Sequence, residues 1–191
     1  MGLTGGIGAG KSEALAALAR LGAATLSTDA VVHELYGDPA VRDAVVARWG
    51  EEVAPDGSVD RAAVARHAFA APNERAWLEA LLWPRVGARV QAWRAEAAAS
   101  GPRALVVETP LLFEAGMDQI YDSTIAVIAD ESVRTRRAAA RGHAAVDERT
   151  ARQLTQAEKA ARADHVVRND GDLAALEQEL AGILEKLDGS A

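Results

Sequence analysis

The stretch Gly5-Gly6-Ile7-Gly8-Ala9-Gly10-Lys11-Ser12 fits the pattern G-x-x-x-x-G-K-[ST] and stands directly before a helical run. Its glycines let the backbone turn tightly and bring several N–H groups onto one anion, because no Cβ stands in the way. Lys11 adds a mobile positive charge, Ser12 adds a hydroxyl that can ligand Mg²⁺, and the helix dipole points at the same anion. The pattern therefore predicts a phosphate-binding loop.

The flanking residues supply the strand–loop–helix setting that this motif requires. Residues 1–4 form the end of a short strand, and residues 12–21 carry Leu15, Leu18 and Leu21 at helical spacing. A Gly-rich segment followed by lysine can also be a plain flexible turn. The setting favours the phosphate loop over that alternative.

Composition bounds the rest of the chain. At 191 residues it suits one α/β domain with helical attachments better than two full domains. Aromatic residues are only 4% and charged residues 26%, which suits a helix-rich soluble protein. The absence of cysteine excludes disulfides, thiolate metal sites and cysteine nucleophiles, so any metal should be a hard cation on oxygen ligands, with Mg²⁺ as the first candidate.

The charge and hydropathy patterns exclude several partners. A net charge of −7 argues against broad nucleic-acid binding, which usually needs a basic face. The sequence has no apolar run of about 18 residues and no basic-then-apolar start, so we expect no membrane span and a cytosolic location. A monomer is the default, since the sequence carries no indication of oligomeric state.

Four further segments have the pattern of strands. Residues 23–27, 104–107 and 123–129 are the apolar runs typical of buried parallel strands, and 165–167 is short enough for an edge strand. Residues 172–187 are expected to close the chain as an amphipathic helix. With helices between the strands, the pattern predicts an α/β fold.

Two carboxylates follow predicted strands. Asp29 comes after strand 23–27, where it can take a proton from an incoming hydroxyl or can simply cap the next helix. Glu108 ends strand 104–107, where it can hold Mg²⁺ through water or act as a helix cap or hinge. Both positions are at the carboxyl edge of a parallel sheet, where open α/β folds place their ligands.

Between residues 39 and 100 the strand pattern gives way to helices. We expect Ser58 to cap a helix over 59–70 and Pro84 to kink or restart the helix that Pro72 opens. The tryptophans Trp77, Trp83 and Trp93 are expected to pack between these helices, with ligand stacking by Trp83 as the alternative. This part of the chain reads as a helical insertion into the α/β core.

The segment after residue 130 carries the arginines Arg134, Arg136, Arg137 and Arg141. Such a cluster is usually a solvated face, but an arginine on a hinged helix can also neutralise a transferring phosphoryl group. Residues 146–163 have the pattern of one polar helix, too weakly amphipathic for a core and suited to a lid.

Several segments, taken in their order and spacing, resemble the dephospho-coenzyme A kinase family. They are residues 2–12, Asp29, residues 69–70 and 72–74, residues 81–84, Glu108-Thr109-Pro110-Leu111-Leu112-Phe113-Glu114, Gln153, residues 158–159, 163–164 and 166–167, and Asn169. The resemblance runs nearly end to end, and the segment from Pro110 to Glu114 is more specific than the phosphate loop, which many kinases share.

The resemblance implies transfer of the γ-phosphoryl group of ATP to the ribose 3′-hydroxyl of dephospho-coenzyme A, the last step of coenzyme A synthesis. It implies a P-loop NTPase three-layer fold with a five-stranded parallel sheet, in which 1–28, 101–133 and 164–191 form the nucleotide-binding core. It also implies a helical acceptor-binding domain over 29–100 and a helical lid over 134–163. ATP, Mg²⁺ and dephospho-coenzyme A would be the small-molecule partners.

We carry these expectations onto named residues. Asp29 is expected to be the base, and Lys11 with Arg137 or Arg141 the other catalytic residues. ATP is expected to meet Gly6, Gly8, Ala9, Gly10, Lys11, Ser12, Glu13 and Asn169. The acceptor is expected to meet Asp29, His33, Leu82, Pro110 and Leu111, and Mg²⁺ to meet Ser12 and Glu108.

The chain departs from the family pattern at several positions. Ser27-Thr28-Asp29 stands where Asp-Ala-Asp is common, Trp83 stands where histidine precedes the proline, and Glu13 replaces a threonine. Two alternatives stay open: another small-acceptor kinase, acting on nucleoside monophosphates or shikimate, and a nucleotide-dependent switch that binds a protein partner. The chain has no N-K-x-D sequence for reading guanine, which disfavours the switch.

Overall fold

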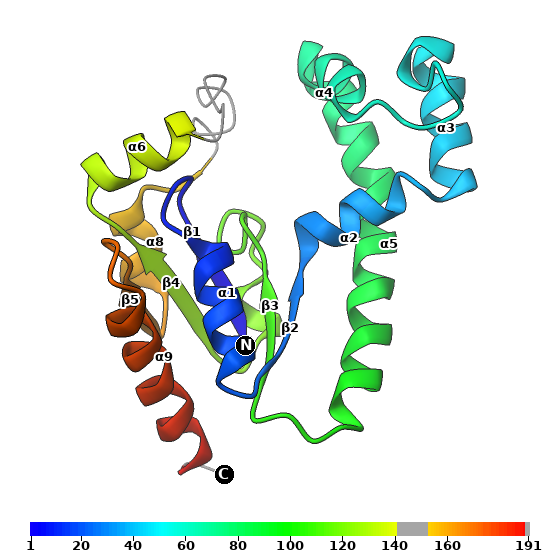
Figure 1. Cartoon of the computed structure of the whole chain (residues 1–191). Helices are drawn as coiled ribbons and strands as arrows, with labels where there is room; N and C mark the ends of the chain where they lie inside the picture. The colour runs from blue at the N-terminus through cyan, green and yellow to red at the C-terminus, as the bar shows by residue number, and fades with distance from the viewer. Residues whose placement is uncertain (141–152, 190–191) are drawn as a thin grey trace. The chain divides into compact units, whose positions relative to one another are not determined.

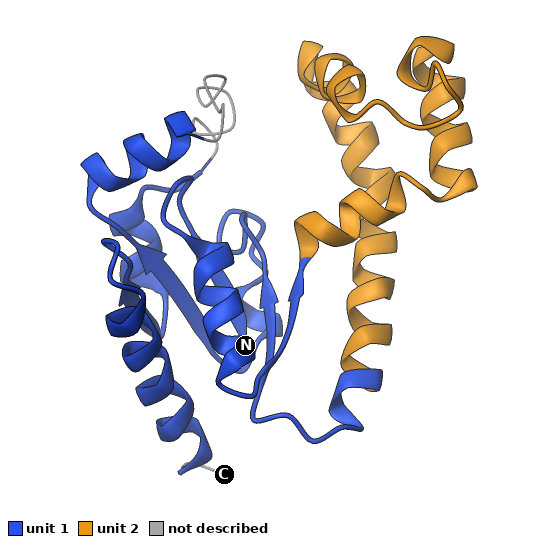
Figure 2. Ribbon diagram, viewed as in Figure 1, with its two compact units in different colours: residues 1–27, 96–191 blue, residues 28–95 orange. Residues whose placement is uncertain are grey.

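The computed structural model describes residues 1–140 and 153–189. The chain divides into two compact units, which are taken separately below (Figure 2). Unit 1 comprises Met1–Ser27 and Glu96–Ala191, and unit 2 comprises Thr28–Ala95. None of the helices in the described residues is long and apolar enough to cross a membrane.

Unit 1 is built on a five-stranded, all-parallel sheet with strand order β2-β3-β1-β4-β5 (Figure 1). Its strands are β1 (Gly2–Gly5), β2 (Ala24–Ser27), β3 (Leu105–Glu108), β4 (Thr124–Ile128) and β5 (His165–Arg168). The sheet confirms the predicted α/β class with five parallel strands, and β5 lies at an edge as expected.

Helices on both faces of the sheet complete three layers. The helices of unit 1 are α1 (Lys11–Arg20), α6 (Glu131–Ala140), α8 (Gln156–Arg162) and α9 (Leu173–Asp188), besides the short turn η2 (Asp118–Ile120). Leu3 of β1 is buried in one core with α1 and α9. Its neighbour Thr4 receives a hydrogen bond from α8. Because successive strand residues face opposite ways, α1 and α9 cover one face of the sheet and α8 covers the other.

Helix α9 shows how the pattern of apolar residues fixes this packing. Leu176, Leu180, Ile183 and Leu184 recur at helical spacing and are all buried. Burial of each such side chain stabilises the fold by about 1.5–3 kcal/mol. Asp172 caps the helix by accepting hydrogen bonds from the N–H groups of Ala174 and Ala175, at 3.0 and 3.2 Å.

Unit 2 consists of helices: α2 (Thr28–Leu35), α3 (Pro39–Trp49), the short η1 (Glu51–Val53), α4 (Arg61–Ala70) and α5 (Pro72–Ala98), whose last turn is counted with unit 1. Its small core includes Val45, Val53 and Val64, with Trp77 packed against it as predicted. Trp49 meets Trp77 edge to face, at a centroid distance of 5.0 Å.

Two predictions for unit 2 were wrong, and at Pro84 one of the two expected outcomes, a restarted helix, is excluded. Asp60, not Ser58, caps α4, because its side chain accepts from the N–H groups of Ala62 and Ala63. Helix α5 does not restart at Pro84, and the Arg85 guanidinium donates to the Leu81 carbonyl in this turn, at 2.6 Å. Trp83 is 56% exposed, so it does not pack between the helices.

The predicted single helix over 146–163 was also wrong for the part that the structure describes. Helix α8 begins only at Gln156, where the hydroxyl of Thr155 and the carboxylate of Glu158 form a capping box. It packs against β4 and β1, and its Lys159 is fully buried. Helix α8 is therefore part of the layered core of unit 1.

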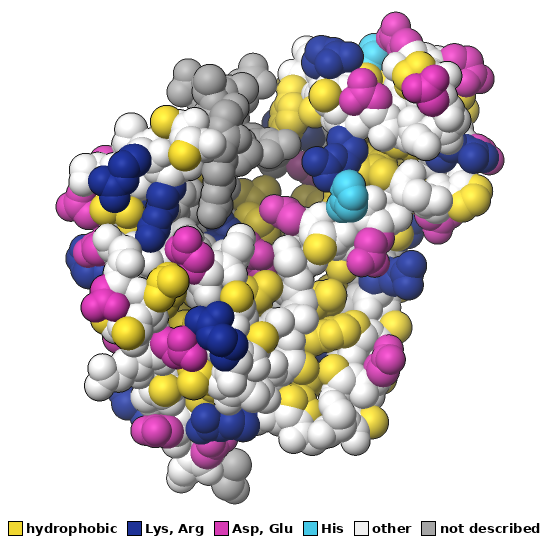
Figure 3. All heavy atoms as spheres, viewed as in Figure 1, with side chains coloured by type: hydrophobic (Ala, Val, Ile, Leu, Met, Phe, Trp, Pro, Cys, Tyr) yellow, Lys and Arg dark blue, Asp and Glu magenta, His cyan; other side chains and the backbone are white. Residues whose placement is uncertain are grey.

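Charged side chains of both signs are interspersed on the face drawn in Figure 3. This mixture matches a chain with 21 basic and 28 acidic residues. The sequence-based expectation that nucleic acid is not a partner stays a prediction.

Candidate active site

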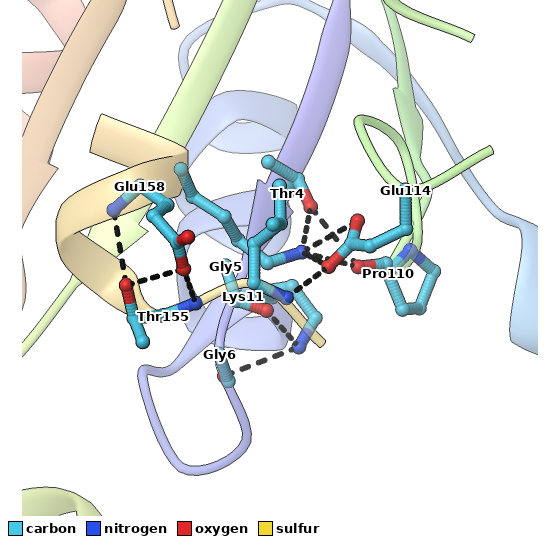
Figure 4. A network of polar contacts seen from close by, with 10 residues as sticks. Thr4, Gly5, Gly6, Lys11, Pro110, Glu114, Thr155 and Glu158 are labelled. Carbon is cyan, nitrogen blue, oxygen red and sulfur yellow. Dashed lines mark hydrogen bonds and ion pairs between the residues drawn. The ribbon is translucent and has the colours of Figure 1, made fainter. Parts of the chain in front are cut away.

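The phosphate loop joins β1 to α1 at the carboxyl edge of the sheet. Gly8 and Gly10 have φ angles of +77° and +91°, which glycine adopts at little cost. Gly10 holds the N-cap position of α1 without a side-chain cap. Lys11 Nζ donates to the carbonyls of Gly5 and Gly6, at 3.1 and 3.4 Å (Figure 4). The loop thus has the tight turns, the helix N-terminus and the ammonium that phosphate binding requires.

Helix α6 packs directly against this loop. The Arg134 guanidinium donates to the Ile7 carbonyl at 3.0 Å and forms an ion pair with Glu131 at 2.6 Å. A Cβ added at Gly8 would lie 2.5 Å from the Arg134 carbonyl oxygen, so only glycine fits there. The arginine cluster is therefore not simply a solvated face, because Arg134 binds the backbone of the phosphate loop at Ile7.

A second contact holds the far end of the loop through Asn169, which is fully buried after β5. Its side-chain amide donates to Glu13 at 2.7 Å, and its side-chain and main-chain oxygens accept from Arg137 at 3.1 and 2.9 Å. A Cβ at Gly10 would meet the Asn169 amide at 2.0 Å. The structure therefore brings together three predicted ATP-site residues and the predicted catalytic Arg137, from three segments that are far apart in the sequence.

A third cluster lies behind the loop, on the α8 face of the sheet. Lys159 Nζ donates to Thr4 Oγ1 at 3.3 Å, to the Pro110 carbonyl at 2.7 Å and to Glu114, whose Oε1 is 2.8 Å away (Figure 4). Burial lowers the pKa of the Lys159 ammonium, and the hydrogen bond and charge of Glu114 oppose that fall. Glu114 also accepts from the backbone N–H of Leu154, at 2.8 Å.

The predicted metal ligands lie at the carboxyl edge of the sheet. Glu108 is the last residue of β3, is paired in register with Leu3 of β1 and Ser27 of β2, and is 6% exposed. Ser12 is the second residue of α1 and is exposed. Pro110 and Leu111, two of the predicted acceptor residues, follow Glu108 in the loop after β3.

The other predicted acceptor residues belong to unit 2. Asp29 lies in the first turn of α2, which begins at Thr28, so the structure does not give Asp29 the N-cap position. Its side chain is exposed, as is that of His33 one turn later, which contacts Arg61. Leu82 on α5 is buried. Arg141 lies outside the described residues.

Sequence reasoning missed the contacts of Thr4, Arg134 and Lys159. A lysine in a polar helix has the pattern of a solvated residue, and its carboxylate partner is 45 residues away. Only the resemblance carried any indication, since Glu114 and Lys159 both belong to its matching segments.

Comparison with known proteins decides the family. A family model described as dephospho-CoA kinase matches residues 1–175. The dephospho-CoA kinase of Moorella thermoacetica is 38% identical over 193 residues, covering 98% of this chain and 91% of the relative. That of Deinococcus radiodurans is 38% identical over 191 residues, covering 98% and 92%.

The chain belongs to the dephospho-CoA kinase family.

Solved structures share the fold of this chain. The crystal structure of TT1252 from Thermus thermophilus is similar with a TM-score of 0.79 and 33% identity, over 97% of this chain and 96% of that one. The dephospho-CoA kinase from Campylobacter jejuni has a TM-score of 0.71 at 21% identity, covering 100% and 98%, which supports the fold alone. Members of the dephospho-CoA kinase family phosphorylate dephospho-CoA with ATP in the final step of coenzyme A synthesis.

Proposed function

We propose that this chain transfers the γ-phosphoryl group of ATP to the ribose 3′-hydroxyl of dephospho-CoA, with Mg²⁺ as the metal and the cytosol as the location. The observation that carries the proposal is a complete phosphate loop in a chain of this family. Phosphoryl transfer asks mainly for positioning and charge neutralisation, because its transition state is loose.

The loop would hold the phosphates of ATP. The N–H groups from Gly6 to Ser12 and the Lys11 ammonium would contact the β- and γ-phosphates, where the dipole of α1 adds partial positive charge. Glu13 and Asn169 would line one side of the nucleotide site. There Asn169 donates to Glu13 and accepts from Arg137. Arg137 or Arg141 would neutralise charge on the transferring group.

The candidate metal ligands suit Mg²⁺. Ser12 offers a hydroxyl, and Glu108 offers a carboxylate at the edge of the sheet where the loop begins. Among residues 1–140 and 153–189, no group of three or more His, Cys, Asp or Glu side chains is arranged for a metal. A cation with only these two protein ligands would take its others from phosphates and water, as Mg²⁺ prefers. When bound, it would neutralise charge on the β- and γ-phosphates.

Asp29 would orient and deprotonate the ribose hydroxyl. Its carboxylate is exposed and follows β2 by two residues, at the carboxyl edge where parallel sheets carry their ligands. His33, Leu82, Pro110 and Leu111 would contact the acceptor, and unit 2 would serve as the acceptor-binding domain. Of the expected lid, 134–163, helix α8 belongs to the layered core of unit 1, so the part of this segment before α8 would act as the lid, excluding water during transfer.

The test is a product assay with a panel of acceptors. With ATP and Mg²⁺ we expect dephospho-CoA to be converted into CoA with one ADP per CoA, and AMP or shikimate to be inert. Shikimate belongs in the panel because a shikimate kinase from Bacteroides thetaiotaomicron has a related fold, with a TM-score of 0.52 and 16% identity. ATP hydrolysis that needs a protein partner, without a phosphorylated small molecule, would favour a nucleotide switch.

A further inference from the structure

The ammonium of Lys159, on α8, contacts both the end of β1 and the segment that follows β3. Its three N–H donors are all used, on Thr4 Oγ1, on the Pro110 carbonyl and on Glu114. Thr4 also donates from its hydroxyl to the Pro110 carbonyl, at 3.2 Å. Thr4 is the residue before Gly5 and the phosphate loop, and Pro110 begins the loop proposed to contact the acceptor.

These contacts lie just beyond the last hydrogen bond that joins β3 to β1. The register pairs Leu3 with Glu108, and the Thr109 N–H donates to the Leu3 carbonyl at 2.8 Å. After this hydrogen bond the segment that follows β1 continues into the phosphate loop, and the segment that follows β3 continues into the loop proposed to contact the acceptor. Beyond this hydrogen bond the Pro110 carbonyl accepts from Lys159 Nζ and from the Thr4 hydroxyl, so side chains hold the two segments together where the ladder has ended.

The charge arrangement makes this junction stiff. The side chains of Lys159 and Glu114 are 1% and 12% exposed, so the pair is taken out of water. A buried ion pair with all its hydrogen bonds made is geometrically specific, although apolar replacement of both partners is often no less stable. A pair of this kind is therefore better suited to fixing a geometry than to adding stability.

We propose that Lys159 and Glu114 are positioning residues that set the acceptor loop after β3 against the phosphate loop, so that the γ-phosphoryl group meets the acceptor hydroxyl and not water. The inference rests on the proposed function. Without the ammonium, Pro110 and Leu111 are held less firmly while the phosphate loop keeps its own contacts. ATP still binds, the acceptor hydroxyl is misplaced, and water takes more of the γ-phosphoryl group, giving inorganic phosphate.

The test is the double variant Lys159→Met/Glu114→Gln. Methionine keeps much of the length of lysine without its charge, and glutamine keeps a carbonyl oxygen for the Leu154 N–H. The Pro110 carbonyl keeps its bond from Thr4. Removing both charges thus avoids an unpaired buried charge, which would unfold the protein for reasons unrelated to positioning. The matched control is Arg20→Gln/Glu177→Gln, which removes an exposed ion pair between α1 and α9.

We expect the double variant to fold, to bind ATP within about twofold of the parent, and to lose about 10–100-fold in kcat/KM for dephospho-CoA, since misplacement of about 1 Å can cost that much. The ratio of ADP to CoA formed should rise above one, which a purely structural role would not produce. The control should keep parent kinetics and a ratio of one.

Parent-like kcat/KM and a ratio of one in the double variant would overturn the proposal and leave the pair a structural feature. If the double variant does not fold, Thr4→Val carries the test: the change removes the Thr4 hydroxyl from the Pro110 carbonyl with little change of shape. It should raise the ADP to CoA ratio, and an unchanged ratio again refutes positioning. A parent chain that forms no CoA would instead refute the proposed function.

Discussion

Replacing Gly8 with alanine should disturb ATP binding by moving α6 off the phosphate loop. The φ of +77° at Gly8 costs an L residue about 1–2 kcal/mol. The new methyl would also lie 2.5 Å from the Arg134 carbonyl oxygen and 3.0 Å from its Cα, both backbone atoms that cannot rotate away. Overpacking of this kind typically costs about 1–3 kcal/mol. Together the backbone strain and the overpacking should cost about 2–5 kcal/mol of stability. This cost would destabilise the phosphate loop and the helix α6 that packs against it.

Gly101→Ala separates the two effects, because Gly101 also has a positive φ, of +63°, in the same unit, but a Cβ there meets nothing within 4 Å. We expect both variants to lose about 1–2 kcal/mol through backbone strain in chemical denaturation. Only Gly8→Ala should also weaken ATP binding by tenfold or more in calorimetry, since each 1.4 kcal/mol is a factor of ten. Equal ATP affinity in the two variants would refute the inferred contact between α6 and the loop.

Four further outcomes are expected. Lys11→Ala should lower turnover by about 10²-fold or more in a fold with a parent-like melting temperature, because it removes a preorganised charge; near-normal turnover would contradict the phosphate-loop assignment. Asp29→Asn should leave melting and ATP binding unchanged and slow CoA formation by about 10²–10⁴, whereas a change of only a few-fold would remove its role as the base. Arg137→Ala should lower kcat far more than ATP affinity if the guanidinium meets the transition state, while a loss confined to affinity would assign it to holding Asn169. Hydrogen bonds from the Thr124 hydroxyl and N–H lower the pKa of Asp164, so its stabilisation is complete above about pH 4 and is lost as the pH falls through the folded pKa. Asp164→Asn should unfold more easily than the parent at pH 7, and a gap between the two that does not narrow as the pH is lowered below about 4 would contradict this origin.

The sheet was predictable because its determinants are local. A buried parallel strand such as β4 is a short apolar run, and the amphipathic α9 repeats its leucines at helical spacing, so each can be recognised in a window of a few residues. Helix starts were harder, since both Ser58 and Asp60 are good N-caps and only the packed helix selects Asp60. The prediction that Trp83 packs between helices was wrong because large aromatic side chains are usually buried in the core. No sequence pattern distinguishes an exposed tryptophan from a buried one.

Within the candidate site, the loop itself was predictable and its surroundings were not. The pattern from Gly5 to Ser12 encodes a backbone shape, but the hydrogen bond from Arg134 to Ile7 joins residues 127 apart. Arginines on one helix have the same pattern whether they face solvent or another segment. The group that such an arginine contacts depends on which segment the fold brings near it. The local sequence pattern around the arginine does not show this.

Glycine in the phosphate loop is therefore required for two different reasons. The positive φ values at Gly8 and Gly10 favour glycine whatever packs against the loop, because glycine has no Cβ. The close approach of Arg134 to Gly8 and of Asn169 to Gly10 is a property of the folded chain, because both neighbours arrive from distant segments. At Gly10 the nearest atom ends a side chain, whereas at Gly8 it is backbone. A substitution at Gly10 can thus be relieved by movement of Asn169, with Glu13 and Arg137 following, while one at Gly8 must displace α6 itself.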